Sequence, residues 1–183
     1  MSKVWLRFLM ISMLAGSFLQ GQELVKAGED APTFFLTFLD GEKFYLSRTV
    51  GAKARDNLRK PLVLSFFATW CIPCKKEIPQ LEILQKKYPD AGIYLIDVNE
   101  PKDLLRDYMA EYNIELKVLI DRYGKTASKY GVVSDQGRGS LPTLFIIAED
   151  GKVLLSHVGY KEGDEEEYDA VLARITAEKV TSD

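Results

Sequence analysis

The sequence is poor in the residues that metal sites and disulfide frameworks need, with two cysteines and one histidine among 183 residues. Zinc normally takes four ligands, and His157 lies far along the chain from the cysteine pair, which argues against a zinc site. Cys71 and Cys74 are separated by only two residues, so a bond between them would close too small a loop to stabilise much of a fold. The spacing therefore indicates chemistry rather than a structural bridge.

Long stretches of one charge are also lacking. The chain has 24 Lys and Arg against 27 Asp and Glu, a formal net charge of −3, and no extended basic run. This composition does not resemble a nucleic-acid-binding surface, and we expect no nucleic-acid partner. The hydrophobic share of 46% suffices for the core of one ordinary domain.

The apolar run nearest the amino terminus, residues 5–19, is shorter than the roughly 20 residues that span a bilayer comfortably. It has no acidic residue and is accompanied by Lys3 and Arg7, as is typical of a secretory signal. We predict that residues 1–22 are a signal peptide, with an inner-membrane anchor as the alternative. Either would place a single domain, residues 23–183, in the periplasm or otherwise outside the cytoplasm.

Strand and helix patterns alternate along the first part of that domain. Residues 33–39 and 43–46 are rich in Phe, Thr and Tyr, and Asp40-Gly41 between them predicts a β-hairpin. Residues 48–60 have no clean period and are expected to form a loop or a short helix. Buried-strand patterns then alternate with helix patterns, and this alternation predicts that the strands pair in parallel. The strand patterns cover residues 61–67 and 93–98, and the helix patterns cover residues 75–88 and 102–112.

The carboxyl-terminal part changes to an antiparallel pattern. Asp150-Gly151 predicts a second hairpin, and a final helix begins with acidic residues, which favour the positive end of a helix dipole. The elements expected here are a strand, a short helix, two paired strands and a helix, over residues 117–120, 125–130, 143–148, 152–158 and 164–179. The fold class is therefore α/β, a mixed sheet flanked by helices with an additional amino-terminal hairpin.

The cysteine pair falls at the turn between a buried strand and a helix. A thiol attacks a disulfide as the thiolate, and the unpaired N–H groups at a helix amino terminus stabilise that anion. We expect Cys71 to be exposed and to attack first, and Cys74, one turn further in, to be sheltered and to displace the captured partner. Pro73 suits the first helical turn because its missing N–H costs little there.

The stretch from Trp70 to Pro79, reading Trp-Cys-Ile-Pro-Cys-Lys-Lys-Glu-Ile-Pro, resembles the active site of ResA/TlpA-like thioredoxins. Ser140-Leu141-Pro142-Thr143 resembles the cis-proline loop of the same fold, and the order of elements agrees from residue 31 to about residue 178. The resemblance implies a thioredoxin-like three-layer sandwich and an extracytoplasmic thiol-disulfide oxidoreductase. It needs no cofactor beyond a redox-active Cys71–Cys74 disulfide.

Further expectations follow from the resemblance. The family implies a reductase of protein disulfides, often those of apocytochrome c, recharged by a membrane-embedded thiol donor; we expect a monomer. Residues 132–139 make a longer approach to the cis-proline than is usual, which leaves the substrate open. The residues expected to form the docking surface are Trp70, Ile72, Pro73, Leu141 and Pro142.

Glu77 has two interpretations that the sequence leaves equally open. Three residues after Cys74, it lies on the core side of the helix, where burial would raise its pKa and let it exchange protons with Cys74, as a buried acid does in the family. It could equally be a solvated glutamate beside Lys75 and Lys76. In ordinary thioredoxins the acid lies on the preceding strand, but that position holds Ser65, which does not titrate usefully.

Three other functions compete with disulfide exchange. A carrier could hold Cu(I) between the two cysteines, although copper-delivery relatives would add a well-placed histidine and wider cysteine spacing. A non-redox module could hold peptides in the groove near Trp70 and Pro142. A peroxidase is the weakest alternative, because the Cys-x-x-Cys arrangement does not suit it. We assign no chemistry to His157, an expected strand residue.

Overall fold

The computed structural model describes residues 23–134 and 139–180. In chain order its elements are β1 (Phe35–Phe38), β2 (Lys43–Tyr45), α1 (Leu46–Thr49), the 3₁₀ turn η1 (Asp56–Leu58), β3 (Leu62–Phe67), α2 (Ile72–Lys87), β4 (Gly92–Val98), α3 (Lys102–Glu111), β5 (Lys117–Asp121), α4 (Lys125–Lys129), β6 (Thr143–Ile147), β7 (Val153–Val158) and α5 (Asp164–Val180). The predicted signal peptide or anchor lies outside the described residues. Within them, no helix combines the length and apolarity that crossing a membrane requires.

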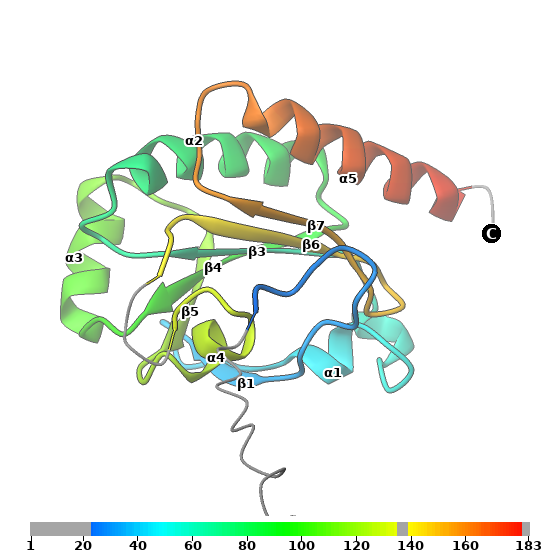
Figure 1. The fold of residues 1–183 in the computed structure, drawn as a ribbon, viewed down its shortest axis with the longest axis horizontal. Helices are drawn as coiled ribbons and strands as arrows, with labels where there is room; N and C mark the ends of the chain where they lie inside the picture. Colours follow the sequence, from blue (N-terminus) through cyan, green and yellow to red (C-terminus); the bar gives the residue numbers. More distant parts are fainter. Residues whose placement is uncertain (1–22, 135–138, 181–183) are drawn as a thin grey trace, which may run out of the picture.

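The strands form one mixed sheet in the order β2-β1-β5-β4-β3-β6-β7. Strands β3, β4 and β5 are parallel, while the hairpins β1–β2 and β6–β7 extend the sheet on its two sides by antiparallel pairing. Both hairpins turn where the Asp-Gly pairs predict, and the parallel unit is the expected one. The predicted α/β sandwich with an added amino-terminal hairpin is confirmed (Figure 1).

The sheet separates two hydrophobic clusters. One lies beneath α2, α3 and α5, and the other lies beneath α1, α4 and the lead-in before β1. Strand β3 supplies both, because its side chains alternate: Val63 and Phe67 enter the first cluster, and Leu64 and Phe66 enter the second. All six residues of β3 are buried, as its continuous apolar run predicts for a central strand.

Two helices differ in detail from their apolar patterns. The pattern after the cysteines covers residues 75–88, while α2 begins at Ile72, with Cys71 as its cap and Pro73 in its first turn, as predicted for these two residues. In α3 the neighbouring apolar residues Leu104 and Leu105 differ, because Leu104 is 45% exposed and Leu105 is fully buried. Adjacent helical residues point about 100° apart, so only one of the two can face the sheet.

Candidate active site

Cys71 and Cys74 lie where the last residue of β3 leads into α2. Cys71 is the cap residue of the helix, and the backbone N–H of Cys74 donates to Cys71 Sγ at 3.3 Å. This N–H is one of the groups that a helix start leaves unpaired, and it points the positive end of its dipole at the sulfur. In a reduced protein the same geometry would stabilise a Cys71 thiolate.

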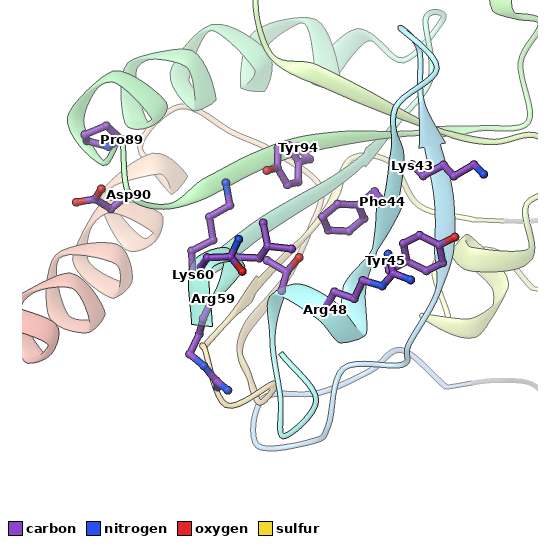
Figure 2. Close-up of a pocket in the computed structure, with 12 residues that line it drawn as sticks. Lys43, Phe44, Tyr45, Arg48, Arg59, Lys60, Pro89, Asp90 and Tyr94 are labelled. Carbon is purple, nitrogen blue, oxygen red and sulfur yellow. The ribbon is translucent and has the colours of Figure 1, made fainter. Parts of the chain in front are cut away.

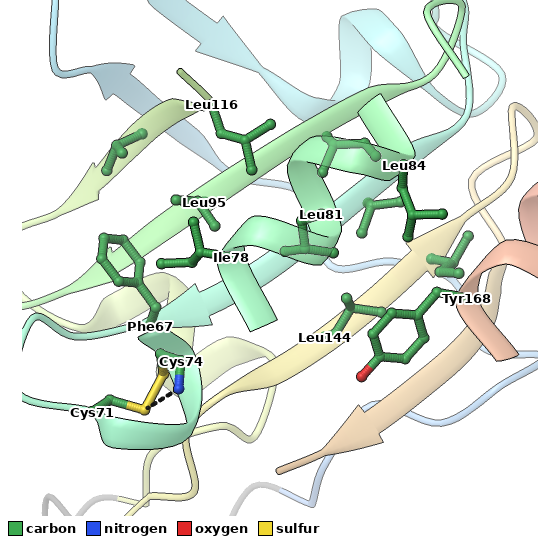
Figure 3. Close-up of a cluster of buried hydrophobic side chains, with 14 of the residues drawn as sticks. Phe67, Cys71, Cys74, Ile78, Leu81, Leu84, Leu95, Leu116, Leu144 and Tyr168 are labelled. Atoms are coloured by element: carbon green, nitrogen blue, oxygen red, sulfur yellow. Dashed lines mark hydrogen bonds between the residues drawn. A yellow bond between two sulfur atoms is a disulfide. The ribbon is translucent and has the colours of Figure 1, made fainter. Parts of the chain in front are cut away.

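The two cysteines form a disulfide with a Cα–Cα distance of 5.3 Å (Figure 3). The expectation that Cys71 is exposed is wrong for this oxidised form: its side chain is 4% exposed, against 0% for Cys74. Cys71 is part of the hydrophobic cluster that also contains Phe67 and Ala68. Cys71 is still the less buried of the two residues, and the order in which they react stays a prediction.

The predicted docking residues divide into exposed and buried groups. Trp70 and Ile72 flank Cys71 and are 71% and 72% exposed, while Pro73 is half-buried. The Leu141–Pro142 peptide bond is cis, as predicted. Pro142 is buried, and Leu141 packs against the cluster that contains both cysteines. The chain thus presents two apolar side chains to solvent directly beside the disulfide.

Glu77 is fully buried, so the solvated alternative is wrong. Its carboxylate accepts hydrogen bonds from Ser65 Oγ at 2.6 Å and from the Tyr168 hydroxyl at 3.4 Å. Burial is the main cause that raises the pKa of Glu77, to about 7; the two hydrogen bonds oppose it. A carboxyl group with this pKa exchanges protons readily near neutral pH.

Glu100 is a residue of the site that the sequence analysis missed. Its two carboxylate oxygens accept from the backbone N–H and the hydroxyl of Thr69, both at 2.7 Å, which ties down the loop that carries Trp70 and Cys71. Nearby Asp97 accepts from the Glu100 backbone N–H at 3.2 Å, and burial raises its pKa to about 7. The sequence did contain a signal for Glu100, since it is an acid placed shortly after β4. Parallel strands β3 and β4 end at the same edge of the sheet, so a residue after β4 can reach the loop after β3.

His157 takes part in a polar cluster on the α5 side. Its Nε2 lies 3.0 Å from Asp164 Oδ2, its Nδ1 lies 3.4 Å from Glu167 Oε2, and its ring meets Tyr168 edge to face. The histidine is a residue of strand β7, as expected. Across residues 23–134 and 139–180, no three His, Cys, Asp or Glu side chains are grouped so as to hold a metal ion.

A pocket of about 450 Å³ lies near the first residues of β3 (Figure 2). Cys71 lies beyond the other end of that strand, which ends at Phe67. Both arginines of this pocket have partners: Arg48 stacks on Tyr45 at 3.8 Å, and Arg59 donates to the carbonyl oxygens of Glu149 and Ala54. None of the predicted site residues lines this pocket, so it is separate from the dithiol.

The comparisons with known proteins agree with this architecture. A model of the AhpC/TSA family matches residues 27–156. The chain belongs to this family. Among curated members, the thiol-disulfide oxidoreductase ResA of Bacillus thuringiensis (strain Al Hakam) is 34% identical over 161 residues, covering 87% of this chain and 84% of ResA. This AhpC/TSA family member is thus a ResA-like thiol-disulfide oxidoreductase, and the predicted resemblance is confirmed.

Solved structures extend the comparison to the fold. A thioredoxin-family thiol:disulfide interchange protein from Chlorobium tepidum TLS superposes with a TM-score of 0.63 at 26% identity, covering 84% of this chain and 98% of that one. A secreted disulfide oxidoreductase of Mycobacterium tuberculosis gives a TM-score of 0.59 at 22% identity, covering 77% and 95%. The thioredoxin-like fold of this AhpC/TSA family member is therefore shared along most of each chain.

Proposed function

We propose that the protein reduces disulfide bonds in other proteins outside the cytoplasm, and that Cys71 and Cys74 are its reactive thiols. The observation that carries the proposal is the position of Cys71 Sγ, which caps α2 and receives the N–H of Cys74 at 3.3 Å. The ResA-like relatives support thiol-disulfide exchange as the class of reaction. The direction of the reaction, the kind of substrate and the cellular compartment go beyond what these relatives support and are our proposal.

The first step is an attack by the Cys71 thiolate on a disulfide of the bound protein. A bond forms between Cys71 Sγ and one substrate sulfur, the substrate disulfide breaks, and its other sulfur leaves as a thiolate that takes a proton. The N–H groups at the start of α2 favour the thiolate, while Trp70 and Ile72 offer apolar surface to the substrate chain. The product is a mixed disulfide.

The second step is an attack by Cys74 on Cys71 Sγ. Cys74 is fully buried, so forming its thiolate requires an acceptor close at hand. Glu77 lies one helical turn away on the same face of α2 and takes the proton. The substrate sulfur leaves as a thiolate and is protonated, and the protein is left with the Cys71–Cys74 disulfide that the structure contains.

The substrates we infer are envelope proteins with accessible disulfides, apocytochrome c among them, held in extended form along Leu141 and Pro142. A pocket of about 590 Å³ lies beside the site, lined by Glu100 and Tyr123 among others, and gives room for a neighbouring segment. Residues 1–22 would export the protein or anchor it to the inner membrane. A membrane-embedded dithiol would return the two electrons, and the protein would act as a monomer.

Trapping the mixed disulfide tests the assignment of the two cysteines. In insulin reduction assays, Cys74→Ser is expected to accumulate a covalent complex with insulin through Cys71, because the second step is blocked. The matched variant Cys71→Ser is expected to form no such complex and to lose activity by at least about 100-fold. Equal trapping by both variants, or full activity in the double serine variant, would reject the mechanism; tight Cu(I) binding without insulin reduction would favour a metal carrier instead.

A redox titration tests the direction of the reaction. The protein is equilibrated with glutathione buffers of different composition, and the fraction of disulfide is read by alkylation. A reductase is expected to have a potential more negative than that of the glutathione pool, about −220 mV or below. A value near the −120 mV typical of a strong oxidant would show that the protein forms disulfides instead.

A further inference from the structure

Both carboxylate oxygens of Glu77 are held by hydroxyl groups from other elements of the fold. Ser65 on β3 donates to Oε2 at 2.6 Å, and Tyr168 on α5 donates to Oε1 at 3.4 Å. All three side chains are fully buried. A buried carboxylate depends on such donors for its stability, because burial removes it from bulk solvent.

The other titratable groups that face Glu77 do not stabilise its negative charge. Asp164, at the start of α5, raises the pKa of Glu77 by its own negative charge, and the charge of Glu77 in turn raises the pKa of Tyr160, just before α5. Cys74 lies one turn away on α2 itself. His157 on β7 pairs with Asp164 and Glu167 rather than with Glu77. Within the described residues, no Lys, Arg or His forms an ion pair with Glu77.

The two hydroxyl contacts favour the ionised carboxylate, since each hydroxyl donates a proton into the hydrogen bond. Burial and Asp164 act in the opposite direction and favour the neutral acid. Without Ser65, the neutral form would prevail over a wider pH range, and fewer molecules would have a base ready beside Cys74. The shorter Ser65 contact is expected to contribute more than the longer Tyr168 contact.

We propose that Ser65 and Tyr168 are positioning residues that keep the Glu77 carboxylate ionised and aimed for transfer of the Cys74 proton. The proposal rests on the proposed function, in which Cys74 must lose its proton before it attacks Cys71 Sγ. That proton passes from Cys74 Sγ to a Glu77 oxygen, and no electrons move in the transfer. Ser65 thus has a part in the reaction although it does not titrate.

The first test follows the Glu77 carboxyl itself and needs no catalysis. Carbon-13 NMR of the oxidised protein gives the midpoint of the Glu77 titration in the wild type, in Ser65→Ala and in Tyr168→Phe. Ser65→Ala is expected to raise the midpoint by about one pH unit, and Tyr168→Phe by less. Circular dichroism checks folding, and Tyr168→Phe still tests the idea should Ser65→Ala fail to fold. An unmoved midpoint in both folded variants overturns the proposal.

The second test follows the release of a trapped substrate at different pH values. The rate at which Cys74 resolves a mixed disulfide on Cys71 is expected to rise through the same midpoint as the Glu77 titration, and to shift with it in Ser65→Ala. In a Glu77→Gln background, Ser65→Ala is expected to leave the rate unchanged. A shifted titration without a shifted rate profile overturns the transfer role. A wild type that reduces no disulfide refutes the proposed function instead, and the NMR titration stays interpretable.

Discussion

At the scale of single residues, the feature that sets this molecule apart from a generic α/β sandwich is an acid buried without a cation. Glu77 is fully buried, and among the described residues the donors to its carboxylate are two hydroxyl groups, with no cation paired to it. Desolvation of the charged form opposes folding whenever the group is ionised. The site therefore carries a stability cost that varies with pH.

The sign of that dependence follows from the two pKa values of Glu77. Its pKa is about 7 in the folded protein, against an ordinary value of 4.5, so the folded state holds the proton more tightly. Below about pH 4.5 the group is protonated in both states and costs nothing; stability falls as the pH rises towards about 7, and the loss persists above it. A difference of this size corresponds to about 3 kcal/mol. Buried Asp97 acts in the same direction.

Replacing Glu77 by Gln is expected to remove its share of this loss. Urea unfolding of the oxidised protein from pH 4 to pH 8 should show the free energy of unfolding falling by about 1–3 kcal/mol less in Glu77→Gln than in the wild type. Glu111→Gln, an exposed change, is the control and should follow the wild-type profile. Parallel profiles for Glu77→Gln and wild type would mean that folding leaves the pKa of the Glu77 carboxyl unchanged, and would contradict the raised pKa.

The contacts of Glu77 show which part of the site the sequence could reveal. The three-residue spacing from Cys74 predicts the inner face of α2, because it is a local helical property. The two partners are 12 and 91 residues away in the chain and meet Glu77 only through the packing of α2 on β3 and α5. Sequence reasoning dismissed Ser65 as unable to titrate, yet a hydroxyl acts here as a donor. The exposure of Cys71 was misjudged because its burial depends on packing in the cluster with Phe67 and Ala68, which the local pattern does not show.

At the scale of elements, the hairpins and parallel strands were predictable, since Asp-Gly turns and apolar runs are local signals. The faces of helices were less predictable, since only one of two neighbouring leucines in α3 is buried.

The substitution Leu105→Ala is expected to lower the free energy of unfolding by about 2–4 kcal/mol, because a fully buried side chain leaves a cavity. Leu104→Ala, its neighbour with 45% exposure, should cost less than about 1 kcal/mol in the same urea titration. Equal losses would mean that α3 is rotated relative to the sheet.

The end of α4 depends on a glycine that the lead-in segment approaches closely. Gly131 has φ +71°, and an added Cβ would lie 2.5 Å from Leu24 Cα. The neighbouring backbone bond from Val25 N–H to the Tyr130 carbonyl, 3.1 Å long, holds the two segments together. The pattern of the sequence gives no sign of this contact, because it joins segments more than 100 residues apart.

Substituting Ala at two glycines separates steric contact from backbone strain. Gly131→Ala is expected to destabilise the protein by about 2–4 kcal/mol, through strain together with displacement of the lead-in. Gly124→Ala, with φ +62° and no atom within 4 Å of the added Cβ, should cost only about 1 kcal/mol. Thermal unfolding by circular dichroism gives both values. Equal costs at the two positions would contradict the close approach of residues 23 and 24.

At the scale of the whole molecule, the disulfide and the fold are linked thermodynamically. A dithiol whose folded form is more reducing than its unfolded form must have an oxidised state that is more stable against unfolding than its reduced state. Closing the short Cys71–Cys74 loop contributes about 2 kcal/mol to the oxidised form by chain entropy. Stabilisation of the Cys71 thiolate by the start of α2 acts against this difference.

The proposed reductase direction therefore predicts that the oxidised protein is the more stable form. In urea titrations at pH 7 with and without a reductant, the oxidised wild type should unfold at the higher midpoint, by an energy difference of up to about 2 kcal/mol. The double variant Cys71→Ser, Cys74→Ser controls for direct effects of the reductant and should unfold identically in both solutions. A more stable reduced form would mean that the fold favours the dithiol, as in a strong oxidant. Each 1.4 kcal/mol of this difference would raise the reduction potential by about 30 mV. The charge-stabilising geometry at Cys71 would then outweigh the loop term, and the protein would donate disulfides rather than remove them.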